Sequence, residues 1–267
     1  MRLNANYHTH STLCDGTSTI RECADVAVRK GFTHLGFSGH MDDDVHMDFE
    51  LYLTEVNKIR DEFKSKLEIL CGVELDNLYD PRFADNVDYV IGSTHFLDVN
   101  YERPLSIDDT SDDVVLLCNE FFGGDYLKLC RAYYDIEATI ADKFSCTFIG
   151  HFDLVTKFNN VLHFVDENDP RYLEPAYEAM EILVKKGIPF EVNTRQASRK
   201  KLFPGGKLLH RLHDLNGEIL ISSDAHNAEE LDYGFNFAIN EVKRYGFDHI
   251  NILSLNKGKL EYEQIGI

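Results

Sequence analysis

Histidine and carboxylate residues recur along this chain in a spacing that could bind metal ions. The motif His8-Thr9-His10 directly follows a short apolar segment. Side chains at positions i and i+2 of a β-strand point to the same side, so both imidazoles could reach one ion. Asp224 and His226 repeat this spacing near the other end of the chain. The pattern predicts a polynuclear metal site and favours a metal-dependent hydrolase.

The candidate ligands share a position, because each lies at or just after the end of an apolar segment of strand length. The set is His8, His10, His40, Glu74, His95, His151, Asp224 and His226. Parallel sheets and barrels gather their functional groups at the carboxyl ends of their strands, so we expect these side chains to meet. Small residues such as Ser38-Gly39 and Gly150 precede them and leave room for close packing. Imidazole and carboxylate donors suit Zn, Mn or Fe.

Two kinds of segment alternate along the chain and would position these residues. Apolar segments of strand length cover residues 3–7, 34–38, 68–73, 89–92, 147–149, 189–192 and 219–222. Segments with apolar residues at helical spacing cover 19–30, 49–64, 125–143, 172–186 and 234–245. Residues 108–113 and 158–170 are expected to be long connections. The alternation predicts an α/β fold with a mainly parallel sheet or barrel, in one domain of residues 1–267.

The composition limits the classes of partner. Asp plus Glu total 46 against 27 Lys plus Arg, and this formal charge of -19 would repel a polyanion, so we expect no nucleic-acid partner. The sequence has no run of 18 apolar residues, so we expect no membrane partner. Six cysteines without paired spacing, together with no apolar leader, favour a cytoplasmic location. The oligomeric state stays open.

Six segments together resemble the polymerase and histidinol phosphatase (PHP) family of metal-dependent phosphoesterases. They are HTHSTLCDG, FSGH, CGVELD, VIGSTH, IGHFD and SSDAH, and they occur in order over nearly the full length. The segments 92–97 and 122–134 look most similar to the histidinol-phosphate phosphatase branch. The resemblance implies a distorted (β/α)7 TIM-like barrel with three divalent or mixed-valence metal ions, Zn, Mn or Fe, at the carboxyl ends of its strands.

The resemblance also implies which residues hold each ion. The three sets are His8, His10, Glu74 and Asp224; then Asp15, His40 and His226; then Glu74, His95 and His151. Glu74 would bridge two ions. Many relatives carry histidine at the position of Asp15, so its carboxylate would shift the metal preference toward harder ions.

The implied activity is a phosphomonoesterase that converts L-histidinol phosphate to L-histidinol and phosphate in histidine biosynthesis. Metal ions lower the pKa of bound water, so a metal-bound hydroxide would attack phosphorus. The departing alcohol would need a proton from a nearby acid, and the sequence does not choose between Asp224 and a site histidine. Asp224, His226 and Glu74 are the candidate catalytic residues.

Cations should bind the phosphate of this small-molecule ester. Arg195 and Arg199 follow the predicted strand 189–192, and either could provide a guanidinium for the phosphate oxygens. Lys157 lies where relatives often place arginine, and it would act as a point charge without bidentate geometry. The residues 42–44 and His46 are candidates to bind the amine and imidazole of the substrate.

Three alternatives share parts of this pattern. A PHP enzyme for another small phosphate ester or nucleotide would use the same ligands. A metal-dependent amidohydrolase also begins with two histidines on its first strand, but that class commonly uses a carboxylated lysine, and no lysine occupies a matching strand end here. A non-catalytic barrel would bind metal without phosphatase turnover.

Overall fold

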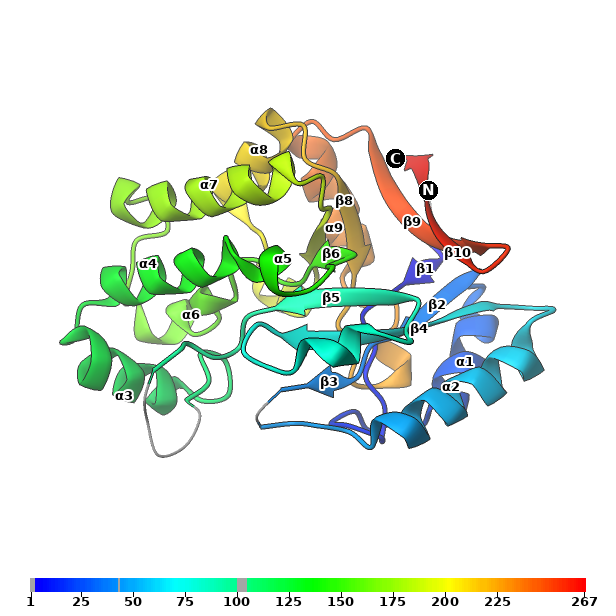
Figure 1. The fold of residues 1–267 in the computed structure, drawn as a ribbon. Helices are drawn as coiled ribbons and strands as arrows, with labels where there is room; N and C mark the ends of the chain where they lie inside the picture. Colours follow the sequence, from blue (N-terminus) through cyan, green and yellow to red (C-terminus); the bar gives the residue numbers. More distant parts are fainter. Residues whose placement is uncertain (1–2, 43, 100–104) are drawn as a thin grey trace.

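A computed structural model describes residues 3–42, 44–99 and 105–267 (Figure 1). Parallel strands form its main sheet in the order β1-β2-β4-β5-β6-β7-β8, and the short β3 also pairs with β4. Their bounds are β1 Ala5–Asn6, β2 His34–Phe37, β3 His40–Met41, β4 Glu68–Asp76, β5 Tyr89–Ser93, β6 Phe148–Ile149, β7 Phe190–Asn193 and β8 Ile219–Ser222. A parallel bridge between Thr9 and Ala225 connects the first and last segments of this sheet. The sheet is therefore a nearly closed barrel, which confirms the predicted TIM-like fold.

Helices surround this barrel. They are α1 Ile20–Lys30, α2 Phe49–Phe63, α3 Ser111–Phe122, α4 Tyr126–Glu137, α5 Ile140–Lys143, α6 Asn159–Leu162, α7 Pro170–Lys185, α8 Gly206–Asp214 and α9 Phe235–Arg244. In Figure 1, α1 and α2 lie beside β2 and β4, whereas α4 and α7 pack together on the opposite side. Among the described residues, every helix is too short or too polar to cross a lipid bilayer. The prediction that residues 1–267 form one domain stays a prediction.

Helix α1 begins and ends where its sequence predicts. The Thr19 side chain accepts a hydrogen bond from the backbone N–H of Glu22, and the Glu22 carboxylate accepts one from the backbone N–H of Thr19. This reciprocal pair satisfies two N–H groups that have no partner within the helix. Gly31 ends the helix with φ 77°, a left-handed conformation that glycine adopts without steric cost.

The prediction of a long connection at 108–113 is wrong, because helix α3 starts within it at Ser111. The Thr110 side chain accepts a hydrogen bond from the backbone N–H of Asp113. Asp112 and Asp113 lie in the first helical turn, where negative charge interacts favourably with the helix dipole. The acidic residues therefore mark the start of a helix.

Two other predicted segments also differ from the structure. The predicted helix 125–143 is divided into α4 and α5, because the Thr139 hydroxyl bonds to the backbone oxygen of Ile136 and competes with continued helix. The predicted connection 158–170 contains the short helix α6, and Pro170 already belongs to α7.

One aromatic ring fills much of the barrel interior. Tyr89 is 1% exposed, and its hydroxyl lies 2.6 Å from the backbone oxygen of Tyr7 and 2.9 Å from that of Phe37. A Cβ atom at Gly36 or Gly72 would overlap this ring. The two glycines on neighbouring strands are thus required for the ring to occupy the barrel.

A hairpin of β9, His249–Asn256, and β10, Lys259–Gly266, covers the amino-terminal end of the barrel strands. The backbone N–H of Leu255 donates to the carboxylate of Glu68, the first residue of β4. The Tyr7 hydroxyl donates to the backbone oxygen of Leu253 at 2.8 Å and accepts from its N–H at 2.9 Å. These contacts close one end of the barrel and leave the carboxyl end of the strands open.

Glu137 on α4 should make the stability of the protein depend on pH. Its side chain is fully buried and accepts a hydrogen bond from the Tyr133 hydroxyl at 3.0 Å. Burial raises the pKa of Glu137 from 4.5 to about 8. Between these values the unfolded chain releases a proton that the folded protein keeps, so stability falls as pH rises through this window.

We expect Glu137→Gln to lessen the fall in melting temperature between about pH 5 and about pH 8, because glutamine keeps the size of the side chain but does not ionise. Thermal unfolding at both pH values measures this effect, and Glu120→Gln on the exposed face of α3 is the control. An unchanged pH dependence in Glu137→Gln would show that this carboxyl group does not titrate within the window.

Candidate metal centre

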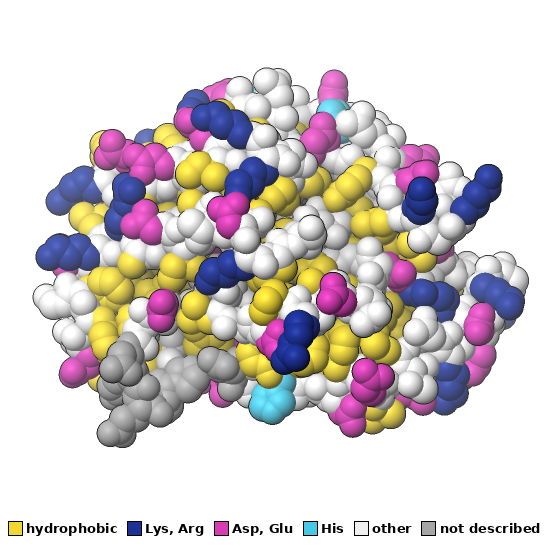
Figure 2. Space-filling view, in the orientation of Figure 1, with side chains coloured by type: hydrophobic (Ala, Val, Ile, Leu, Met, Phe, Trp, Pro, Cys, Tyr) yellow, Lys and Arg dark blue, Asp and Glu magenta, His cyan; other side chains and the backbone are white. Residues whose placement is uncertain are grey.

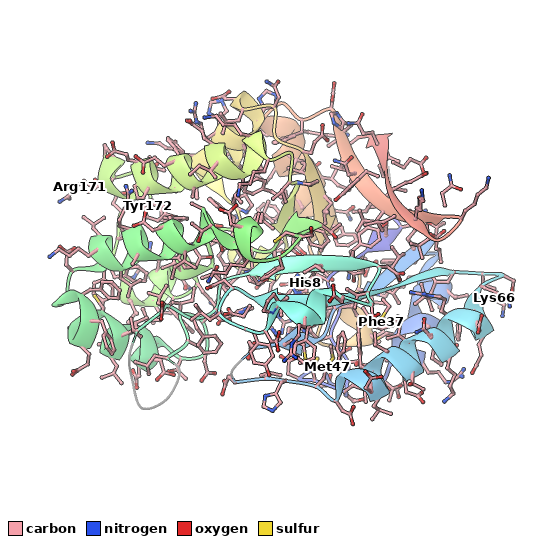
Figure 3. The ribbon with its side chains drawn as sticks, in the orientation of Figure 1. His8, Phe37, Met47, Lys66, Arg171 and Tyr172 are labelled. Atoms are coloured by element: carbon pink, nitrogen blue, oxygen red, sulfur yellow. The ribbon has the colours of Figure 1, made fainter. Side chains whose placement is uncertain are left out.

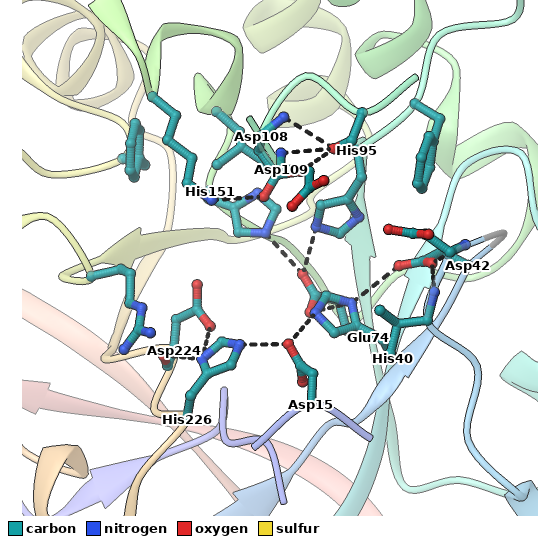
Figure 4. A pocket seen from close by; sticks show the side chains of 18 of the residues that line it. Asp15, His40, Asp42, Glu74, His95, Asp108, Asp109, His151, Asp224 and His226 are labelled. Carbon is teal, nitrogen blue, oxygen red and sulfur yellow. Dashed lines mark hydrogen bonds and ion pairs between the residues drawn. The ribbon is translucent and has the colours of Figure 1, made fainter. Parts of the chain in front are cut away.

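The side chains predicted as metal ligands meet at the carboxyl end of the barrel (Figure 4). Most of them lie in the segments that follow β1, β5, β6 and β8, whereas His40 is the first residue of β3 and Glu74 lies within β4. Their donor atoms form four groups in which all atoms lie within 4.8 Å of one another: His10, Asp15, His40 and His226; His8, His151 and Asp224; His8, His10 and Glu74; His40, Glu74 and His95. Every ligand that the sequence predicts is therefore brought together, and Figure 3 shows His8 near the middle of the molecule.

Glu74 lies at the centre of this cluster, with 1% of its side chain exposed. Its Oε2 atom lies 3.0 Å from His8 Nε2 and 3.5 Å from His10 Nε2. Its Oε1 atom lies 2.8 Å from His151 Nε2 and 3.4 Å from His95 Nε2. The Oε2 atom also lies 3.2 Å from His40 Nδ1. The two oxygens thus face two different sets of imidazoles, which is the arrangement needed for a carboxylate that bridges two ions.

Asp15 connects His226 and His40 to His10, which also faces Glu74. Its Oδ2 atom lies 2.9 Å from His226 Nε2 and 3.7 Å from His40 Nε2, whereas Oδ1 lies 3.1 Å from His10 Nδ1. One carboxylate therefore contacts imidazoles from three segments. His10 joins this group through its other ring nitrogen.

Several polar atoms of the cluster are buried without a hydrogen-bond partner, including His8 Nε2, His10 Nε2, His40 Nδ1 and Glu74 Oε2. His8 Nε2 and Glu74 Oε2 approach each other closely, but they are not aligned as donor and acceptor. Unpaired buried polar atoms are costly and uncommon in native proteins. The donor set and its unsatisfied atoms fit bound cations.

The charges of this cluster depend on one another. Burial alone would raise the pKa of Glu74, but His8 and His40 lower it to well below its ordinary value. Burial lowers the pKa of His8, but Glu74, Glu191 and Asp224 together raise it well above its ordinary value. The carboxylates therefore stay ionised, and protons compete with cations for the imidazoles.

Two buried carboxylates behind the histidines were not predicted as site residues. Glu191 on β7 lies with Oε1 2.7 Å from His8 Nδ1, and its Oε2 accepts from the backbone N–H of His151 at 2.8 Å. Asp76 on β4 accepts from the backbone N–H of His95 at 2.7 Å. Hydrogen bonds of this kind orient metal-binding histidines. An acidic residue inside an otherwise apolar strand is the signal that could have identified Glu191.

A cavity of about 250 Å³ opens over the cluster. Arg195 and Lys157 line it, whereas Arg199 does not and instead donates to Gln196 Oε1 at 3.0 Å. Lys157 Nζ lies 2.9 Å from Asp108 Oδ2. The remaining lining residues include Asp42, Asp44, Asp109, Phe96 and Phe203. Position 43 lies outside the described residues, and His46 is exposed away from this lining.

Comparison with known proteins gives a consistent result. Residues 6–195 match the family model described as PHP domain. The chain is 27% identical over 261 residues to the protein named Probable histidinol-phosphatase of Deinococcus radiodurans, covering 90% of this chain and 92% of that protein. It is 22% identical over 264 residues to the Histidinol-phosphatase of Bacillus subtilis, covering 85% and 95%.

A solved structure shares the fold. The crystal structure of histidinol phosphate phosphatase from Lactococcus lactis, complexed with zinc, L-histidinol and phosphate, superimposes with a TM-score of 0.73. The match covers 97% of this chain and 100% of that chain at 22% identity. The similarity extends over the whole barrel.

Substitution of Glu74 should remove more bound metal than substitution of a ligand at the edge of the cluster. In Glu74→Gln an amide replaces the carboxylate that faces both sets of imidazoles, whereas His226→Asn changes the contacts with Asp15 and Asp224 at the edge of the cluster. We expect Glu74→Gln to retain fewer metal equivalents after dialysis, as measured by elemental analysis. His210→Asn on the exposed face of α8 is the control, and equal metal content in this control and Glu74→Gln would contradict the central position of Glu74.

Proposed function

The chain belongs to the PHP domain family, and we propose on this basis that it is a metal-dependent phosphomonoesterase that hydrolyses L-histidinol phosphate to L-histidinol and phosphate. The position of Glu74 carries the proposal, because its two oxygens face two different sets of imidazoles below an open cavity. The relatives named histidinol-phosphatase support the choice of substrate. The enzyme would act in the cytoplasm, in histidine biosynthesis.

Three metal ions, either zinc, manganese or iron, would occupy this centre. We assign them, as the family resemblance implies, to the sets His8, His10, Glu74 and Asp224; Asp15, His40 and His226; and Glu74, His95 and His151. The donor atoms of the second set lie in one group with His10, whereas His151 groups with His8 and Asp224 and His95 groups with His40 and Glu74. When bound, such ions lower the pKa of water to yield a nucleophile, neutralise phosphate oxygens and stabilise the leaving alkoxide. Glu74, Asp224 and His226 line the cavity and would act closest to the phosphate.

Arg195 and Lys157 supply the positive charge of the cavity wall. The Arg195 guanidinium pairs with Glu230 Oε2 at 2.8 Å, and the Lys157 ammonium pairs with Asp108. These contacts fix the two side chains before a ligand arrives. A guanidinium can donate two parallel hydrogen bonds to a phosphate, and the ammonium adds a point charge.

Acidic side chains on the same wall fit the other half of the substrate. Asp42, Asp44 and Asp109 line the cavity, and they would attract the ammonium group of histidinol phosphate, whereas a neutral leaving group such as glycerol or a nucleoside would gain no such attraction. Phe96 and Phe203 offer apolar surface to the imidazole ring. On the face seen in Figure 2, the described basic side chains are interspersed with acidic ones.

We expect a strong preference for histidinol phosphate over glycerol phosphate and nucleoside monophosphates in kcat/KM, measured as phosphate release by protein of known metal content. Asp44→Asn and Asp109→Asn should each weaken this preference, because they remove a carboxylate that attracts the substrate ammonium. A loss of about tenfold corresponds to one charged hydrogen bond. Equal kcat/KM for the cationic and neutral esters would exclude histidinol phosphate as the preferred substrate. The assignment of the site as a phosphoesterase would still hold.

Arg195→Ala should raise KM by about tenfold or more, because it removes the guanidinium that lines the cavity. Arg199→Ala is the matched comparison, since it removes the same group four positions later, outside the lining. We expect Arg199→Ala to raise KM less than Arg195→Ala does. A larger effect from Arg199→Ala would transfer the phosphate-binding role to that residue.

A further inference from the structure

The side-chain amide of Asn193 contacts three separate parts of the candidate site. Asn193 is the last residue of β7, and its side chain is fully buried. Its Nδ2 atom donates to Glu191 Oε2 at 3.1 Å and to Asp224 Oδ2 at 3.2 Å. Its Oδ1 atom accepts from the backbone N–H of Arg195 at 2.9 Å. One amide group thus joins two carboxylates to the segment that carries the arginine.

The chemistry of these neighbours fixes the orientation of the amide. Both N–H groups face carboxylates, which only accept, and the oxygen faces an N–H group, which only donates. A flipped amide would place its oxygen against Glu191 and Asp224 and its nitrogen against the N–H group of Arg195. Hydrogen bonds to ionised acceptors are stronger than neutral ones, so the observed orientation is strongly favoured.

Asn193 determines which oxygen of Asp224 faces the cluster. Because Asn193 holds Oδ2, Oδ1 is left 3.3 Å from His10 Nε2 and 3.7 Å from His8 Nε2. The backbone of Asp224 has φ 52°, in the left-handed region that residues other than glycine rarely adopt. A conformation of this kind persists only where its surroundings hold it.

Asn193 also acts on His8 through Glu191. Glu191 Oε2 accepts from Asn193, which leaves Oε1 2.7 Å from His8 Nδ1. The Glu191 carboxylate already accepts from Asn193 and from the backbone N–H of His151, so it is placed as an acceptor and the proton of its contact with His8 belongs to Nδ1. In the neutral imidazole the lone pair is then on Nε2, the nitrogen 3.0 Å from Glu74 Oε2, which is the tautomer required of a metal ligand.

The backbone of Asn193 holds the loop that carries Arg195. Its N–H donates to the backbone oxygen of Phe203 at 2.8 Å, and its own oxygen accepts from the N–H of Phe203 at 3.1 Å. Phe203 and Arg195 both line the cavity. The two ends of this loop therefore meet at Asn193.

We propose that Asn193 is a positioning residue that sets the orientation of the metal-facing side chains His8 and Asp224 and of the phosphate-binding loop together. The proposal rests on the proposed function, because that function makes His8 and Asp224 ligands and Arg195 a phosphate-binding residue. It implies that metal affinity and phosphate affinity change together when the amide of Asn193 is altered.

Asn193→Asp tests the proposal, since it keeps the shape of the side chain and places an oxygen against two carboxylates. Chelator competition without substrate gives the affinity for zinc, and inhibition by inorganic phosphate gives the affinity of the metal-loaded protein for phosphate. We expect zinc affinity to fall about 10- to 100-fold and the inhibition constant of phosphate to rise about tenfold. Asn193→Ser, which removes the amide without adding charge, should change both affinities in the same direction.

Thr194→Val is the matched control. Thr194 is the next residue and equally buried, but its hydroxyl bonds only to the backbone oxygens of Ser222 and Tyr233. The melting temperature of every variant is measured beside the affinities, because a purely structural role would lower this temperature and leave the affinities of the folded protein unchanged. Thr194→Val is expected to keep both affinities.

The proposal is overturned if folded Asn193→Asp or Asn193→Ser keeps both affinities within about twofold of the wild type, or if only one of the two affinities changes. Failure of the proposed function has a different signature. A wild-type protein that releases no phosphate from histidinol phosphate would refute the substrate, whereas the ratio of zinc affinities between wild type and variants would still decide the role of Asn193.

Discussion

The burial of an ionised carboxylate at Glu74 constrains the whole carboxyl end of the barrel. A buried charge is stable only where it is paired, and neighbouring strands provide imidazoles on both of its sides. This crowding requires small residues nearby. A Cβ atom at Gly150 would lie 2.6 Å from Ser93 Oγ, which donates to Glu74 Oε1 at 2.9 Å. The charge at the centre therefore dictates the residue types that surround it.

The opposite end of the barrel supplies the rigidity that such a cluster needs. Tyr89 occupies the interior, and Tyr7 links it to the hairpin of β9 and β10 through hydrogen bonds with Leu253. Tyr7 directly precedes His8, so the first residue of the cluster follows an anchored backbone. Polar contacts at one end of the barrel thus help to fix the geometry at the other.

The sequence predicts the barrel strands and the candidate ligands because both depend on local pattern. Apolar segments mark the strands, and the ligands follow them. Glu191 and Asn193 escape this reasoning, since their contacts with His8 and Asp224 join strands that are distant in the sequence. The choice between Arg195 and Arg199 likewise depends on the backbone path after β7. The helix α8 and the β9–β10 hairpin were not predicted, because the amphipathic pattern of α8 covers only nine residues and β10 is exposed along most of its length.

The barrel closes where the segment after β1 pairs with the segment after β8, and the candidate metal ligands lie on both sides of this seam. Asn6 Nδ2 donates to Ser223 Oγ at 2.8 Å across a separation of 217 positions, and Ala225 exchanges backbone hydrogen bonds with His8 and His10 at 3.0 and 2.8 Å. Such long-range pairing carries a large loop-closure entropy. Any cation held between His10 and Asp224 would span this seam as a reversible crosslink, so metal binding would favour the closed barrel over the open chain.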